Sequence, residues 1–375
     1  MKTRVSAFSP RANRRLVIKV GSSLLVEPDG SIRSAWLASL VIDIAARRAA
    51  GQQIILVSSG AIALGSRRLN LAKGGRASLE DAQAAAAVGQ ILLASLYADL
   101  LGKHGLTAAQ MLVTLGDLED RRRYLNASAT LERLLTLGAV PILNENDSVA
   151  TEEIRFGDND RLAARVAQAA QADALILLSD IDGLYTANPH TDPHATRIET
   201  VTDIAKVAHM ASRASASGMG SGGMVAKLEA ARIAHAAGIP VAIVAGKPMH
   251  PLAAFEATGH GTIFTAPDSL TARKAWLAGR LTVAGKLHID GGAARALASN
   301  RSLLAAGITA HEGNFQRGDA VEILSPEGTA IARGLISYDS ADLQRIAGKR
   351  SDAIAAILGY APRAAVVHRD QMVML

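Results

Sequence analysis

The sequence predicts a doubly wound α/β domain with a mostly parallel sheet, followed by a second, smaller β-rich domain. From residue 16 to about residue 244, short aliphatic runs alternate with longer helical patterns, which is typical of a parallel sheet covered by helices on both faces. Beyond residues 260–285, short alternating strands and tight turns replace this rhythm. We therefore expect a basic tail over residues 1–15, a first domain over residues 16–270 and a second domain over residues 281–370.

Six aliphatic runs are predicted to form the sheet of the first domain. They contain few polar residues, which is typical of strands that are buried on both faces. Apolar residues recur at helical spacing over residues 36–44 and 131–135, so both segments are predicted to pack on the sheet as helices. The predicted strands are Leu16–Val20, Gln53–Val57, Leu106–Leu112, Ala139–Leu143, Ala174–Leu178 and Pro240–Val244.

In the second domain, Val321 and Ile323 alternate with Glu322, as in a strand with one buried face. Residues 325–328 then place Pro and Gly where a type I turn tolerates them. Residues 329–336 are predicted to return as the next strand of a small β-rich unit.

Composition and charge narrow the class of protein. The chain has 375 residues, 49% of them hydrophobic, which is enough for two cores. Its net charge of +6 comes mostly from residues 1–15, so we expect a flexible basic tail and a body with little attraction for a polyanion. The chain has no cysteine, and no apolar run approaches the ~18 residues of a membrane span. These features favour a cytoplasmic protein without a membrane partner.

Two familiar nucleotide signatures are absent or out of context. No G-x-x-x-x-G-K-[ST] motif occurs, which argues against a P-loop enzyme. Gly218, Gly220 and Gly223 satisfy G-x-G-x-x-G, but they follow an Ala/Ser-rich, helix-like stretch instead of a strand. The dinucleotide-binding interpretation therefore fails. The Ala/Ser-rich stretch over residues 205–221 is low in complexity, and Gly218, Gly220, Gly222 and Gly223 are predicted to form a mobile loop.

Lys19 lies inside the first predicted strand and is followed by Gly21 and a pair of serines. The carboxyl edge of a parallel sheet is where α/β folds bind ligands. Glycine lets backbone N–H groups approach phosphate oxygens, and a lysine adds a compact positive charge. A solvated lysine at an ordinary strand exit explains the pattern equally well.

A second candidate site, Ser59 and Gly60, follows the next strand and opens a helix whose first amides can hold an anion. The alternative is a serine cap with a glycine for tight packing. A similar pattern recurs later: Ser179 and Asp180 follow a buried strand, and residues 222–227 open a helix with Lys227 in its first turns. Two lysines converging on one sheet edge would suit phosphoryl transfer, whereas Lys227 alone would be an ordinary solvent-exposed lysine.

The most informative segment has two acid/amide clusters, residues 144–147 and 157–160, on either side of a predicted hairpin. Carboxylates and amides together can hold an ammonium group, coordinate hydrated Mg²⁺ or orient lysines. A single capping role for Asp158 or Asp160 leaves the other acids unexplained. No histidine falls in these clusters, which mildly favours a carboxylate acceptor, because a carboxylate is already ionised at pH 7 and needs no base.

Taken in order, these motifs resemble the amino acid kinase family, and among its members those that phosphorylate glutamate. The second domain, with residues 313–319 before a strand, resembles a PUA domain. The resemblance implies the amino acid kinase fold with a PUA-like barrel, ATP and Mg²⁺ as cofactors, L-glutamate as substrate, proline as inhibitor and a homodimer or homotetramer. A glutamyl-phosphate reductase is the partner that such pathways imply.

The resemblance also assigns roles to individual residues. It implies that Lys19 and Lys227 hold the transferring phosphoryl group and that Asp160 orients them. The glutamate-binding positions it implies are Ser59, Gly60, Asp147, Asp158 and Asn159. The nucleotide-binding positions it implies are Lys19, Gly21, Ser179, Asp180, Ser221, Gly222, Gly223, Met224, Val225, Ala226 and Lys227. No metal ligand is assigned.

Two other functions remain open at this point. A related kinase acting on N-acetylglutamate, aspartate, carbamate or UMP would share the lysines and glycines. An RNA-binding protein is the other possibility, because PUA domains elsewhere bind RNA. Residues 281–375 hold ten Lys or Arg against nine Asp or Glu, and this near-neutral balance disfavours a nucleic-acid partner.

Overall fold

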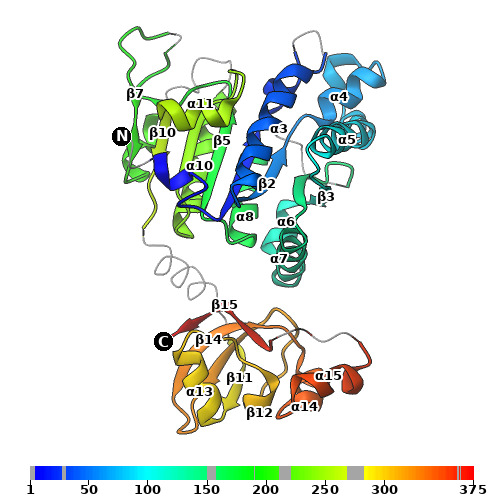
Figure 1. The fold of residues 1–375 in the computed structure, drawn as a ribbon, viewed down its shortest axis with the longest axis vertical. Helices are drawn as coiled ribbons and strands as arrows, with labels where there is room; N and C mark the ends of the chain where they lie inside the picture. The colour runs from blue at the N-terminus through cyan, green and yellow to red at the C-terminus, as the bar shows by residue number, and fades with distance from the viewer. Residues whose placement is uncertain are drawn as a thin grey trace. The chain divides into compact units, whose positions relative to one another are not determined.

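The structure is a computed structural model that describes residues 5–27, 31–149, 158–189, 191–210, 221–267, 283–360, 363 and 365–375. It divides into two compact units (Figure 1). The first comprises Met1–Glu119 and Asn126–Ser269, and the second comprises Asp120–Leu125 and Leu270–Leu375. Each unit has its own sheet and its own hydrophobic core. The predicted fold class is confirmed.

The first unit is built on an eight-stranded sheet in the order β3-β4-β2-β1-β5-β9-β10-β8. The pairs among the first six strands of this order are all parallel, and β10 runs antiparallel to β9. All six predicted strands are present within two residues of their predicted ends, whereas β8 and β10 were not predicted. The strands are β1 (Arg15–Val20), β2 (Gln53–Ser58), β3 (Ala108–Val113), β4 (Val140–Glu145), β5 (Ala174–Ser179), β8 (Thr200–Val201), β9 (Val241–Ala245) and β10 (Gly261–Phe264). A separate hairpin joins β6 (Leu184–Tyr185) and β7 (Arg197–Ile198).

Helices pack on both faces of this sheet (Figure 1). One face carries the main core cluster, in which alternate residues of β1, β2 and β5 meet apolar side chains of three helices. These helices are α3 (Ser34–Ala49), α5 (Leu79–Gly102) and α11 (Pro251–Thr258). The opposite face packs against α8 (Asp158–Ala169), beside which lies α10 (Ser221–Ala236). The shorter or peripheral helices are α2 (Ser22–Leu25), α4 (Ala61–Arg68), α6 (Leu115–Glu119) and α7 (Arg121–Thr136), with 3-10 turns at Ser6–Phe8, Ala72–Gly75 and Ala205–Val207.

The prediction of a flexible tail over residues 1–15 is wrong for residues 5–15. Phe8 is fully buried and meets the ring of Phe255 edge to face at 5.7 Å. Arg47 Nη1 donates to the Phe8 carbonyl at 2.8 Å, and the Arg15 side chain is buried at the start of β1. Apolar residues within the basic stretch explain the difference, because their burial opposes the entropy of a free tail.

Helix α5 differs from the sequence expectation in another way. Among the described residues it is the one helix long and apolar enough, by length and composition, to cross a membrane. In this fold it is a core helix, since Leu93, Tyr97 and Leu101 belong to the main core cluster. Helix α4 packs against its first half at backbone distance: a Cβ on Gly89 would lie 1.7 Å from the carbonyl oxygen of Ala61.

The second unit has a five-stranded sheet in the order β12-β11-β13-β14-β15. The predicted turn joins β13 to β14: Ser325 N donates to Thr329 O at 2.8 Å, and Gly328 N donates to Ser325 O at 2.9 Å. The strands are β11 (Val283–Ile289), β12 (Ile308–Glu312), β13 (Ala320–Leu324), β14 (Ala330–Ile336) and β15 (Val367–Met374). The helices are α13 (Gly291–Ala298), α14 (Ser340–Ile346) and α15 (Ser351–Leu358), with a 3-10 turn at Ala305–Gly307.

Two of the predicted loops fall at least partly on residues that the structure does not describe. Residues 150–157, in the predicted hairpin between the two acid/amide clusters, are not described. Gly218 and Gly220 also lie outside the described residues. Gly222 and Gly223 were predicted in a mobile loop, but they fall in the first turn of α10. The helix that contains them continues through residues with good helix propensity, which favours helix over loop at its start.

Candidate active site

A buried carboxylate holds two lysines at the carboxyl edge of the sheet. Asp160 lies in the first turn of α8 and is fully buried. Its Oδ1 is 2.6 Å from the Nζ of Lys19, which reaches from β1. Its Oδ2 is 3.0 Å from the Nζ of Lys227, which reaches from α10. The structure thus brings together the three residues predicted to be catalytic, and Asp160 lies within the helix instead of capping it.

The electrostatics of this group depend on burial and on the unequal charge count. Burial lowers the pKa of Lys19 from its usual value, and the charge of Lys227 lowers it further, against the opposing effect of Asp160. Burial alone would raise the pKa of Asp160, but the two ammonium groups outweigh it and lower that pKa. Two positive charges therefore face one negative charge in a site with little access to water. Such a group has a residual positive charge available for an incoming anion.

Hydrogen-bonded amides lie on the other side of the carboxylate. Asn159 Nδ2 donates to Ser59 Oγ at 2.8 Å and to Asn144 Oδ1 at 3.1 Å. Asn144 Nδ2 in turn donates to Gln90 Oε1 at 2.9 Å. Asn159 Oδ1 is buried and has no hydrogen-bond partner among the described residues. Ser59 and Asn159 were predicted as binding residues, whereas Gln90 was not predicted at all.

Gly60 joins β2 to α4 and is needed there for its backbone conformation. Its φ of +110° lies in the left-handed region, and an added Cβ would come within 3.1 Å of the side chain of Leu25. The turn directs the first amides of α4 toward the carboxyl edge of the sheet, next to Ser59. An anion can bind at such a helix start.

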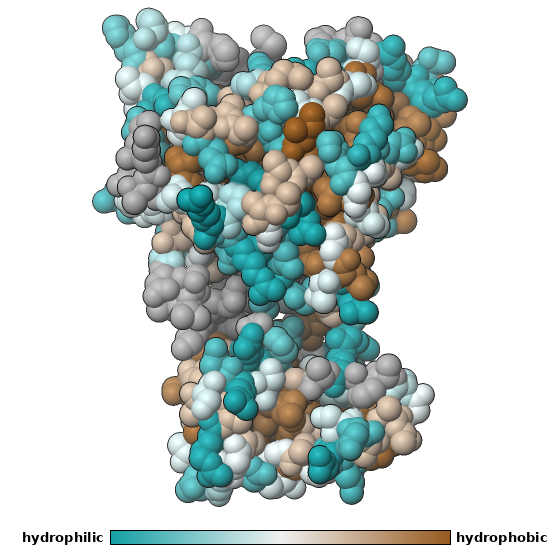
Figure 2. All heavy atoms as spheres, viewed as in Figure 1, coloured by the Kyte–Doolittle hydropathy of each residue, from teal (hydrophilic) through white to brown (hydrophobic). Residues whose placement is uncertain are grey.

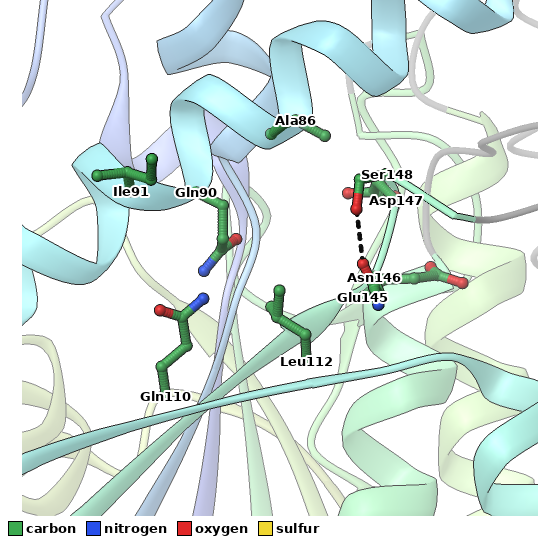
Figure 3. Close-up of a pocket in the computed structure, with 10 residues that line it drawn as sticks. Ala86, Gln90, Ile91, Gln110, Leu112, Glu145, Asn146, Asp147 and Ser148 are labelled. Carbon is green, nitrogen blue, oxygen red and sulfur yellow. Dashed lines mark hydrogen bonds between the residues drawn. The ribbon is translucent and has the colours of Figure 1, made fainter.

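Asp147 lies just beyond β4 and lines a cavity of about 260 Å³ (Figure 3). Helix α5 contributes Gln90 and Ile91 to the same cavity, and β3 contributes Gln110. Asp147 is largely buried, and its charge acts on Arg76: burial lowers the pKa of Arg76, and Asp147 raises it in opposition. Arg76 was not predicted, because it lies in an irregular segment with no recognisable motif.

The predicted nucleotide-binding residues lie around the ends of β5 and the start of α10. Ser179 is buried, and its Oγ donates to Asp180 Oδ1 at 3.0 Å. Lys227 Nζ is 3.4 Å from the carbonyl oxygen of Gly223, one turn earlier in α10. A Cβ on Gly21 would lie 3.7 Å from Lys19 Nζ, so Gly21 borders the lysines. Met224 is buried, Ala226 half-buried and Val225 exposed, and the side chains of Asp158 and Ser221, like the surroundings of Gly222, are not described.

A third polar group adjoins the segment after β5. Asp182 Oδ2 lies 2.6 Å from His260 Nε2, and Tyr185 donates its hydroxyl to Asp182 Oδ1 at 2.9 Å. Partial burial would raise the pKa of Asp182, but these two hydrogen bonds lower it. A histidine, His260, therefore lies beside Asp182 in space, although the two residues are far apart in the sequence. Its position before β10 could be found only from the folded chain.

Among the described residues, no group of three or more His, Asp or Glu side chains gathers where a metal ion could bind. Mg²⁺ in kinases is held largely by the phosphates, with one or two carboxylates from the protein. Asp180 is an exposed carboxylate whose charge raises the pKa of Lys19, so it lies near the lysines. It suits the role of a protein carboxylate that binds Mg²⁺ together with the phosphates.

Comparison with known proteins agrees with this architecture. The sequence matches the amino acid kinase family over residues 14–245 and the PUA domain over residues 285–358. It is 62% identical to a glutamate 5-kinase of Sphingopyxis alaskensis, covering 99% of this chain and 100% of the relative. It is 61% identical to a glutamate 5-kinase of Zymomonas mobilis, covering 99% and 94% of the two chains, and 54% identical to one of Rhizobium etli, covering 96% and 93%.

The chain therefore belongs to the amino acid kinase family and is a kinase with a carboxyl-terminal PUA domain. Its similarity to the relatives named glutamate 5-kinase extends over nearly the full length of each chain.

Proposed function

We propose that this protein transfers the γ-phosphoryl group of ATP to the side-chain carboxylate of L-glutamate, forming L-glutamyl 5-phosphate, the first step of proline synthesis. The observation that carries the proposal is the buried group of Asp160 with Lys19 at 2.6 Å and Lys227 at 3.0 Å, next to a hydrogen-bonded set of amides. The lysines suit a phosphoryl group, and the amides suit an amino acid.

The two lysines would stabilise the negative charge of the phosphoryl group during transfer. Phosphoryl transfer depends mainly on positioning and on charge stabilisation, not on covalent chemistry by the protein. Asp160 holds each ammonium group from one of its two oxygens, so their positions are set before the substrates bind. Its negative charge also favours the protonated form of Lys19, which burial disfavours.

The acceptor needs no general base. A glutamate side chain has a reference pKa of about 4.3, so its carboxylate is ionised at neutral pH. One of its oxygens forms the new bond to the γ-phosphorus, while the bond from that phosphorus to the β–γ bridging oxygen breaks and ADP leaves with the electron pair. No proton has to move in this step.

The nucleotide would bind along the start of α10 and the end of β5. Backbone amides at a helix start attract phosphate oxygens, and Gly223 leaves room for close approach beside Lys227. Mg²⁺ bound with ATP neutralises phosphate charge, and Asp180 is the residue we assign to it. We assign glutamate binding to Ser59, Asp147 and Asn159, with Gly60 shaping the turn and Asp158 nearby in the sequence.

The direct test is hydroxylamine trapping of an acyl phosphate with ATP and Mg²⁺, comparing L-glutamate, N-acetylglutamate and aspartate as acceptors. We expect hydroxamate formation with L-glutamate alone. Formation with another acceptor would keep the kinase chemistry and change the substrate. No hydroxamate from any acceptor would overturn the proposal, and salt-sensitive RNA binding would then be the next measurement.

The proposal also covers the regulation, the assembly and the location of the protein. Proline is expected to suppress hydroxamate formation, and a glutamyl-phosphate reductase is expected to consume the reactive product in the cytoplasm. A homodimer or homotetramer is supported by apolar side chains gathered over α5 (Figure 2), where Ile91 is 73% exposed. A monomer in sedimentation equilibrium would contradict the proposed assembly.

A further inference from the structure

We propose that Gln90 of helix α5 is a positioning residue for the acceptor: acting through Asn144, it fixes the amide of Asn159 so that its carbonyl oxygen faces the amino group of the substrate. This inference rests on the proposed function and deepens it. It assigns a role to Gln90, which makes no described hydrogen bond to Lys19 or Lys227.

The evidence is an unbroken chain of hydrogen bonds from α5 to Ser59. Gln90 Oε1 accepts from Asn144 Nδ2 at 2.9 Å, and Asn144 Oδ1 accepts from Asn159 Nδ2 at 3.1 Å. Asn159 Nδ2 also donates to Ser59 Oγ at 2.8 Å. Gln90 is 8% exposed and Asn144 is 2% exposed, so water competes little for these bonds.

The chain of bonds has a direction, because an amide has one donor end and one acceptor end. When Gln90 presents its oxygen, Asn144 must present its NH₂ group to Gln90 and its oxygen to Asn159. Asn159 then presents its NH₂ group, and both hydrogens are used by Asn144 and Ser59. The side-chain amides of Gln90 and Gln110 point toward one another beside the cavity (Figure 3).

The free end of the chain is the buried Oδ1 of Asn159, which has no partner among the described residues. A buried acceptor without a partner is costly, so a donor in the bound complex would stabilise it. L-Glutamate has two carboxylates, which only accept, and one α-ammonium group, which only donates. The ammonium group is therefore the part of the substrate that matches this oxygen.

Helix α5 is itself held firmly against the site. Gly89, next to Gln90, lets the backbone of α5 meet the first residue of α4. Two turns beyond Gln90, the hydroxyl of Tyr97 lies 3.0 Å from Ser58 Oγ, directly before Ser59. Burial raises the pKa of Tyr97 far above its usual range, so this hydroxyl stays neutral. Gln90 is thus placed by a rigid element, as a positioning residue should be.

The test is steady-state kinetics of Gln90→Met, which keeps the length of the side chain and removes the acceptor. We expect the KM for L-glutamate to rise about tenfold, the size of one lost hydrogen bond to a charged group. The KM for ATP and kcat should stay within about twofold of wild type. The control is Asp99→Asn, at an exposed position on the same helix that takes no part in this chain of hydrogen bonds, and it should leave all three constants unchanged.

Two further measurements separate positioning from general damage. Gln90→Glu keeps an acceptor for Asn144 and should bring the KM for L-glutamate back to within about threefold of wild type. Glutarate lacks the amino group, so its Ki as a competitive inhibitor should be the same in wild type and Gln90→Met. An unchanged KM for glutamate in Gln90→Met, or a parallel rise in the glutarate Ki, would overturn the inference. Inactivity of the wild type toward L-glutamate would instead overturn the proposed function.

Discussion

The two sides of the candidate site are built from different chemistry. The phosphoryl side, Lys19, Asp160 and Lys227, is a buried group of full charges held at 2.6 and 3.0 Å. The acceptor side, Ser59, Asn144 and Asn159, is a set of neutral groups linked by directed hydrogen bonds. The adjacent residues Asn159 and Asp160 of α8 join them. Charge suits the transfer of a phosphoryl group, and directed neutral groups suit recognition of the acceptor. Substitutions on the phosphoryl side should therefore mainly lower kcat, and substitutions on the acceptor side should mainly raise the KM for L-glutamate.

The largest effect is expected from Lys227→Ala. It removes a charge needed mainly in the transition state, so kcat should fall by about 10²–10³ with little change in either KM. Asp160 keeps Lys19 as a partner, so the protein should remain folded. The control is Lys206→Ala, because the Lys206–Asp203 ion pair is solvent-exposed. Turnover near that of wild type in a folded Lys227→Ala protein would remove this lysine from the catalytic group.

Asp160→Asn should change the pH dependence as well as the rate. Burial already lowers the pKa of Lys19 and Asp160 raises it, so removing the carboxylate lowers that pKa further. The protonated, active lysine is then lost at lower pH, so the alkaline limb of kcat/KM should move to lower pH. A pH profile from pH 6 to 10 measures this, with Asp203→Asn as the control. An unchanged alkaline limb would show that Lys19 does not depend on Asp160.

Asp147→Ala tests the acceptor side. If Asp147 holds the amino acid, the KM for L-glutamate should rise about tenfold or more and exceed any change in the KM for ATP. Asp99→Ala, an exposed acid on α5, is the control. Equal changes in both KM values would mean that Asp147 supports the site generally and that the proposed division into two sides is wrong.

The smallest effect on catalysis is expected from Gly89→Ala, which acts through packing. Its Cβ would lie 1.7 Å from Ala61 O, so α4 must shift, and we expect a loss of about 1–3 kcal/mol in unfolding free energy. Gly102→Ala is the matched control on α5, since nothing lies within 4 Å of its Cβ; it should gain about 0.5–1 kcal/mol. Equal stability of the two variants in urea denaturation would contradict the close packing of α4 on α5.

Much of the fold could be predicted because its signals are local. The aliphatic runs of β1, β2 and β5 are each buried along their length, and the turn after β13 has the residues its geometry requires. The antiparallel strand β10 was not predicted, because a short run paired to β9 has no periodicity of its own. The N-terminal segment was predicted to be a flexible tail because its basic residues can be read directly from the sequence. The contact that holds it in place joins Phe8 to Phe255, which is far away in the sequence.

The sequence by itself determined the fold class and indicated which residue types would do the chemistry, including Lys19, Asp160 and Lys227. Only the tertiary structure decided that one carboxylate holds both lysines, because its partners lie on β1 and α10. It also placed Gln90 behind Asn144, His260 beside Asp182 and Arg76 near Asp147. The physical reason is that propensity and periodicity act over a few residues, whereas a hydrogen bond or ion pair depends on the distance in space, which the packing of separate elements sets.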